Sequence, residues 1–194
     1  KNYTRKIMRQ VNYTECSTLK QLAEQTIKGL SEAYDYEFPE YLRKMPSYLK
    51  DCDSYRELGT NQGGSASIAL LENLKYYEFI DKGFKNYRPQ KPILDSYIAD
   101  KDIEIVMHEK SSLEVDTDVC TDFLLIDSVH KYKHVKREIE IYGPLTTKFI
   151  MFHDTHGIPE VYTAVTEFIN STNEWKEIEH YAKGAGYTVL KRVK

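Results

Sequence analysis

The sequence predicts an α/β protein built on a mostly parallel, doubly wound sheet of seven strands, with an antiparallel β-hairpin at the C-terminal end. Three observations support this. A glycine-rich turn at residues 59–64 joins a short strand to an apolar helical run. Strand-like and helix-like segments then alternate, as in a parallel sheet covered by helices. Residues 182–186, which include two glycines, separate two strand-like segments and predict a hairpin. We therefore expect a Rossmann-like architecture.

Composition limits the class of protein. The 194 residues are most simply one domain, and 41% hydrophobic with 29% charged residues is typical of a globular chain. A net charge of -3 without a basic run argues against nucleic acid as the main partner. The apolar runs are too short for a membrane span. Three cysteines without metal-like spacing predict reduced thiols and a cytoplasmic location.

Residues 1–50 predict a helical extension in front of a core at residues 51–194, within a single domain of residues 1–194. Ser17 is a plausible N-cap, and apolar residues from Leu19 to Leu30 repeat at helical spacing. An aromatic stretch at residues 34–48 follows, broken by two prolines. It fits a lid over an active site and a packed connector equally well.

The glycine-rich turn is the first candidate binding element. Glycines allow a sharp turn and a close approach of the backbone to a ligand, and the following helix directs free N–H groups at that ligand. A dinucleotide fingerprint needs glycine at its first, third and sixth positions, and here Asn61 takes the third. The alternative is a tight turn that binds nothing.

The pattern E-x-G-x-x-x-G-G-S, which starts at Glu57, resembles motif I of class I S-adenosylmethionine-dependent methyltransferases. That resemblance implies that the turn holds the methionine part of the cofactor. The residues it assigns to cofactor binding are Glu57, Gly59, Thr60, Asn61, Gly63 and Ser65.

The next two strands add nucleoside contacts. Residues 76–81 predict a strand that ends in Asp81, about 20 residues beyond the turn, where a carboxylate can accept from both ribose hydroxyls. Asp81 fits a nicotinamide cofactor as well as S-adenosylmethionine. A helix at 93–99 and a strand at 103–107 follow. Residues 108–112 then lie where the adenine is expected, with Ser111 as the contact, whereas His108 is as well explained by a structural role.

The second half of the chain predicts the centre of the sheet. The apolar run at 123–126 suits a central parallel strand, a helix at 131–142 follows, and residues 148–152 form the fifth strand. A helix begins near Pro159, and residues 175–181 and 187–192 form the hairpin. Five α/β units closed by a hairpin resemble the full class I methyltransferase fold, whose last strand is antiparallel.

Carboxylates and imidazoles follow the fourth and fifth strands. Ligands bind beyond the carboxyl ends of strands in doubly wound sheets, so Asp127, His130, His153, Asp154 and His156 should share one rim. Oxygen ligands from the two aspartates suit a divalent metal, and His130 suits a general base. The alternative is that the aspartates cap helices and that the histidines are surface residues.

The motifs D-x-x-H at Asp127 and H-D-T at His153 resemble those of metal-dependent O-methyltransferases that act on sugars, including macrolide sugars, in the cephalosporin-hydroxylase-like group. The resemblance covers residues 54–192. It implies that Asp127 and Asp154 bind metal, that Asp127 also adjoins the cofactor, and that His130 is the base. The group carries Glu-Asp where this chain has His153-Asp154, and an imidazole ligand favours manganese over magnesium.

The resulting hypothesis is an S-adenosylmethionine-dependent O-methyltransferase for a sugar hydroxyl of a glycan, assisted by Mg²⁺ or Mn²⁺. Because the chain begins with Lys1, we expect a domain of a longer glycan-synthesising polypeptide, for instance one joined to a glycosyltransferase domain. Catechols remain alternative acceptors. Two other hypotheses stay open, an NAD-dependent oxidoreductase and a non-catalytic scaffold domain of the same fold.

Overall fold

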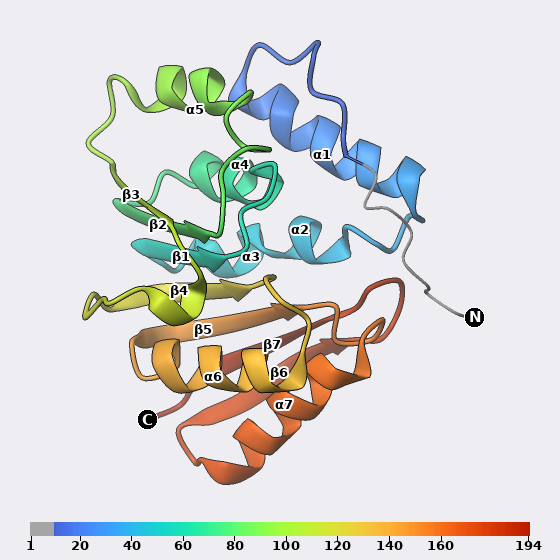
Figure 1. The fold of residues 1–194 in the computed structure, drawn as a ribbon, viewed down its shortest axis with the longest axis vertical. Helices are drawn as coiled ribbons and strands as arrows, with labels where there is room; N and C mark the ends of the chain where they lie inside the picture. Colours follow the sequence, from blue (N-terminus) through green and yellow to red (C-terminus); the bar gives the residue numbers. More distant parts are fainter. Residues whose placement is uncertain (1–9) are drawn as a thin grey trace.

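The computed structural model describes residues 10–194, and its centre is one seven-stranded sheet with the strand order β3-β2-β1-β4-β5-β7-β6 (Figure 1). The strands are β1 (Ser54–Leu58), β2 (Tyr76–Asp81), β3 (Glu104–Glu109), β4 (Thr121–Ile126), β5 (Thr146–His153), β6 (Trp175–Tyr181) and β7 (Tyr187–Arg192). The helices are α1 (Leu19–Ala33), α2 (Glu40–Lys44), α3 (Pro46–Leu49), α4 (Gly64–Leu71), α5 (Lys91–Ile98), α6 (Tyr132–Tyr142) and α7 (Pro159–Ser171).

The strand pairing confirms the predicted fold class. The first five strands pair in parallel, and β7 lies antiparallel between β5 and β6. Leu58 at the end of β1 is in register with Ile80 of β2 and Ile126 of β4. Because these ends are aligned, the residues that follow the three strands emerge together at one edge of the sheet.

Alternating side chains of the strands build two cores, one on each face of the sheet. Tyr55, Phe79 and Phe123 pack towards the face covered by α1, α4 and α5, while Leu58 and Leu124 pack towards α6 and α7 (Figure 1). Central strands covered on both faces need apolar residues at every position. This requirement explains the uninterrupted apolar run at residues 123–126 of β4.

A buried ion pair interrupts that apolar pattern. Arg56 is fully buried, donates to Glu78 over 2.6 Å and donates through Nη2 to the Val119 carbonyl. His108 completes the group at 2.9 Å from Glu78 Oε1. His108 therefore lies within β3 and has a structural contact, which agrees with the structural alternative for this residue.

The N-terminal extension is helical over α1, α2 and α3, while the part of the prediction that concerns residues 1–9 falls outside the described residues. The N-cap of α1 is Thr18, in a capping box with Gln21, so the expectation of Ser17 was wrong by one residue. Ser17 instead donates to Gln21 Oε1. None of the helices within residues 10–194 is long and apolar enough to cross a membrane.

Candidate active site

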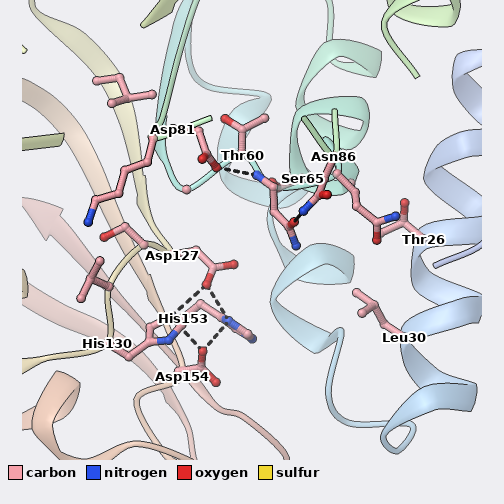
Figure 2. Close-up of a pocket in the computed structure, with 18 of the residues that line it drawn as sticks. Thr26, Leu30, Thr60, Ser65, Asp81, Asn86, Asp127, His130, His153 and Asp154 are labelled. Carbon is pink, nitrogen blue, oxygen red and sulfur yellow. Dashed lines mark hydrogen bonds and ion pairs between the residues drawn. The ribbon is translucent and has the colours of Figure 1, made fainter. Parts of the chain in front are cut away.

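A cavity of about 380 Å³ lies at the carboxyl ends of β1, β2, β4 and β5, closed on one side by the N-terminal extension (Figure 2). Its polar wall comes from the strand ends, and its apolar wall from α1 and the segment that leads into α2. Switch points at strand ends are the usual ligand sites of doubly wound folds. The cavity therefore lies at the edge of the sheet where the sequence predicts a ligand site.

Glycine is required twice in the turn after β1. Gly59 has φ 98°, and a Cβ there would lie 2.1 Å from the Asp127 carbonyl oxygen. Gly63 has φ 82°, and a Cβ there would lie 2.6 Å from the Tyr87 ring. Gly63 is also the N-cap of α4 and supplies no side-chain cap, so the first N–H groups of α4 are free of side-chain partners within the described chain.

Asn61 adopts φ 47° at the centre of the turn, a left-handed conformation that asparagine tolerates better than most residues. Its N–H donates to Asp81 Oδ2 over 2.8 Å, and its side chain accepts from Asn86 over 2.9 Å (Figure 2). Gly83 N–H donates to the other Asp81 oxygen. Asp81 is thus held in place at the pocket wall, where its remaining lone pairs suit a diol.

Glu57 lies fully buried behind the turn and does not line the cavity, unlike Thr60 and Ser65. It accepts a hydrogen bond from Tyr55 over 2.7 Å. Burial raises the pKa of Glu57 to about 7, and the hydroxyl groups of Tyr55, Ser65 and Thr60 offset part of that rise. A cationic group bound at the turn would favour the ionised carboxylate.

One glutamine ties the N-terminal segment to the turn. Gln62 accepts from Val11 N–H over 2.9 Å and donates to the Val11 carbonyl over 3.0 Å. Gln10 adds a contact to Asn86 over 3.1 Å. Through these bonds residues 10–13 form part of the cavity wall next to the turn.

The serine that lines the pocket is the neighbour of the one that the sequence predicts as the adenine contact. Ser111 caps a short 3₁₀ helix by accepting from Leu113 N–H and does not line the cavity, whereas the neighbouring Ser112 does. Ser112 donates to the buried Glu138, which also accepts from Ser128 over 2.6 Å. This buried acid belongs to α6, and sequence spacing alone gave no sign of it.

Glu138 provides a pH-dependent prediction. Burial raises its pKa to about 7, against the lowering effect of Ser112 and Ser128, so the folded chain holds a proton that the unfolded chain releases above its ordinary pKa of 4.5. Raising the pH from 5 to 8 therefore favours unfolding. Glu138→Gln cannot release this proton. We therefore expect the unfolding free energy of the wild type, relative to that of Glu138→Gln, to fall by up to about 3 kcal/mol between pH 5 and pH 8. Urea denaturation of both proteins at pH 5 and pH 8 measures it, and parallel pH curves would contradict it.

Four side chains form the centre of the rim, which we call the rim cluster: Asp127, His130, His153 and Asp154. Figure 2 shows them facing one another. Asp127 Oδ1 lies 3.2 Å from His130 Nε2 and 3.1 Å from His153 Nδ1. Asp154 Oδ2 lies 3.0 Å and 3.3 Å from the same two nitrogens. The structure therefore brings together four of the five residues that the sequence placed on one rim, whereas His156 is exposed and does not line the cavity.

The charges of the rim cluster reinforce one another. Burial alone would raise the pKa of Asp127, but His153 and His130 outweigh it and hold that pKa well below its usual range. Burial likewise opposes charge on His153, yet Asp154 and Asp127 raise its pKa well above the ordinary value. The pKa of His130 is also raised, because Asp127 and Asp154 outweigh its burial. Paired charges of this kind are typical of functional sites.

The backbone at Asp154 is unusual. Its φ is 60°, in the left-handed region that residues other than glycine seldom enter. Asp154 directly follows β5, and its carbonyl accepts from Ile158 N–H at the start of the next turn. Strained conformations persist where the surroundings enforce them, often in active sites. Here the turn places the Asp154 carboxylate next to both histidines.

The donor set fits a divalent cation. One ligand atom each from Asp127, His153 and Asp154 lie within 4.8 Å of one another. Neighbouring ligands about 2.1 Å from one ion and at right angles to each other are roughly 3 Å apart. The distances from His153 Nδ1 to the two carboxylates, 3.1 and 3.3 Å, match this spacing. A mixed nitrogen and oxygen set suits manganese better than magnesium.

No protein-family profile matches the chain, and no curated protein matches it in sequence. Its fold is similar to solved structures. A Staphylococcus aureus protein provisionally described as a caffeoyl-CoA O-methyltransferase has a TM-score of 0.66 at 16% identity, covering 92% of this chain and 94% of the other. An O-methyltransferase from Bacillus cereus in complex with SAH gives 0.61 at 17%, covering 95% and 94%.

A third structure is the O-methyltransferase TomG from Streptomyces achromogenes, involved in tomaymycin synthesis and solved with SAM. It gives a TM-score of 0.59 at 14% identity, covering 93% of this chain and 92% of the other. The similarity extends over nearly the whole of each chain. The chain therefore has the fold of class I S-adenosylmethionine-dependent methyltransferases.

Proposed function

We propose that this protein is an S-adenosylmethionine-dependent O-methyltransferase that methylates a sugar hydroxyl of a glycan with the help of a divalent metal. The observation that carries the proposal is the rim cluster, which opens into the same cavity as the glycine-rich turn. A methyl donor and a deprotonated hydroxyl have to meet in one place, and this cavity supplies a site for each.

The cofactor half of the cavity suits S-adenosylmethionine. The start of α4, Thr60, Ser65 and the carboxylate of Asp81 line it, with Glu57 behind them. Asp81 would accept from the ribose hydroxyls and Glu57 would balance the amino group. Ser112 takes the adenine-side role proposed for Ser111, because it is the serine in the wall.

In the acceptor half, Asp127, His153 and Asp154 would hold the metal and His130 would take the proton of the acceptor hydroxyl. S-adenosylmethionine supplies an electrophilic methyl group, and its transfer forms one oxygen–carbon bond as one carbon–sulfur bond breaks. Neighbouring carboxylates favour the protonated imidazole that results.

A sugar acceptor is supported by aromatic side chains next to the rim cluster. Tyr34 and Phe38 stack with ring centroids 4.1 Å apart, and both line the cavity. Aromatic faces pack well against the apolar C–H face of a sugar ring, while the rim cluster faces its hydroxyl groups. A glycan acceptor would also suit a polypeptide that includes a glycosyltransferase domain, as proposed from the sequence.

The decisive experiment is calorimetric titration of the protein with S-adenosylhomocysteine and, separately, with NADH, each with and without Mn²⁺. We expect micromolar binding of S-adenosylhomocysteine and none of NADH. Transfer of labelled methyl from S-adenosylmethionine to oligosaccharides, with catechol for comparison, then tests the acceptor. Absence of S-adenosylhomocysteine binding under both conditions would contradict the enzyme proposal and favour a scaffold of the same fold.

A further inference from the structure

Tyr41, at the start of α2, contacts two members of the rim cluster, Asp127 and His153. Its hydroxyl donates to Asp127 Oδ2 over 3.3 Å. Its ring lies against the His153 imidazole, with centroids 4.0 Å apart and planes inclined by 33°. Tyr41 is buried, at 6% exposure, and lines the cavity.

The hydroxyl contact fixes how Asp127 presents its two oxygens. Oδ1 faces His130 and His153, and Oδ2 accepts from Tyr41. The carboxylate cannot rotate without losing one of these contacts. Hydrogen bonds of this kind to a ligand carboxylate orient it and raise metal affinity.

The ring contact replaces a hydrogen bond that His153 lacks. A metal-binding histidine usually donates its second ring N–H to a carboxylate, a carbonyl or water, which fixes the ring orientation. His153 Nε2 is buried and has no hydrogen-bond partner within the described chain. The imidazole instead contacts two aromatic rings, the tilted ring of Tyr41 and that of Phe38, whose centroid lies 5.6 Å away in an edge arrangement.

Tyr41 is itself held rigidly. Leu42, Met45 and Leu49 of the same segment are almost completely buried. Arg43 donates to the Tyr36 carbonyl over 2.7 Å and to Ser31 over 2.9 Å, which ties the α1–α2 connection to α1. A rotamer locked by packing is what the support of a functional site requires.

We propose that Tyr41 is the positioning residue of the metal site, orienting Asp127 through its hydroxyl and His153 through its ring. This inference rests on the proposed function, because it assigns the rim cluster a metal ion. It also gives the N-terminal extension a role beyond covering the cavity, since part of the site geometry is built by α2.

Two substitutions separate the two contacts. Tyr41→Phe keeps the ring and removes the hydroxyl, and we expect Mn²⁺ affinity to fall about 10-fold; Tyr41→Leu removes both, and we expect a loss nearer 100-fold. Calorimetry with Mn²⁺ alone measures both values. Tyr48→Phe is the control, because the Tyr48 hydroxyl donates to Glu179 outside the cavity, and it should bind Mn²⁺ like wild type.

A second measurement needs no metal. The side-chain NMR signals of His153 in the metal-free protein should shift or broaden in Tyr41→Leu, while those of the remote His180 on β6 stay unchanged. If the wild type does not bind Mn²⁺, the metal is removed from the proposed function. The His153 signals then test by themselves whether Tyr41 positions His153. Unchanged His153 signals in folded Tyr41→Leu, or wild-type Mn²⁺ affinity in both variants, would overturn the inference.

Discussion

His130→Ala should lower methyl transfer by a factor of about 10² to 10⁴ while leaving S-adenosylhomocysteine affinity unchanged. His130 Nε2 faces both Asp127 and Asp154, at 3.2 and 3.0 Å, on the open side of the rim cluster. It is 29% exposed, whereas His153 is 5% exposed and packed under aromatic rings. His130 is therefore the imidazole that an acceptor hydroxyl can reach.

The rate is measured as S-adenosylhomocysteine formed with the best acceptor of the oligosaccharide series, and cofactor affinity by calorimetry. His180→Ala is the matched control, because His180 stacks on Tyr162 and contacts Thr188 away from the cavity. It should retain full turnover. A His130→Ala protein with more than half of the wild-type rate would remove His130 from the role of base.

Gly59→Ala should destabilise the fold by at least about 3 kcal/mol and abolish cofactor binding. The added Cβ would lie 2.1 Å from the Asp127 carbonyl oxygen, and φ 98° is strained for any side chain. The Asp127 backbone cannot move away from the added Cβ on its own, because Asp127 N–H donates to the Leu58 carbonyl at the end of β1. The junction of β1 and β4 has to open, and the turn and the rim cluster are displaced together.

Gly83→Ala is a control from the same pocket. Its φ is not in the left-handed region, and the nearest atom to an added Cβ would be Glu109 Oε1 at 3.8 Å. We expect its unfolding free energy to stay within about 1 kcal/mol of wild type. Urea denaturation and S-adenosylhomocysteine titration of both variants measure the difference. Equal losses of unfolding free energy in the two variants would show that the close contact at Gly59 is not what destabilises Gly59→Ala.

The sequence predicted the parts of this protein that depend on local pattern. Alternating segments predicted the seven strands, and the hairpin at 175–181 and 187–192 agrees with β6 and β7. Polar residues directly after β4 and β5 were expected on one rim, because parallel strands end at a common edge. The structure brings His130 and His153 each within hydrogen-bond range of both Asp127 and Asp154.

Features that depend on contacts between distant segments could not be predicted. Tyr41 is one of five aromatic residues singled out at 34–48, and only the packing of α2 selects it as the neighbour of Asp127. Ser111 and Ser112 are adjacent, and which one faces the cavity depends on the 3₁₀ turn. The burial of Arg56 could not be predicted either, because its ion-pair partner Glu78 is on another strand. Long-range pairing leaves no periodic signal in a single sequence.

The bonds between Gln62 and Val11 have a consequence for how the chain can be shortened. The Gln62 side-chain amide forms hydrogen bonds with both the N–H and the C=O of Val11, as the backbone of a neighbouring strand would. This one residue of the turn therefore anchors the segment at 10–13. Trimming the chain past Val11 would remove part of the pocket wall and leave the amide without either partner. A shortened chain therefore has to keep residues 10–13, which precede the first helix, because they contribute to the cavity wall.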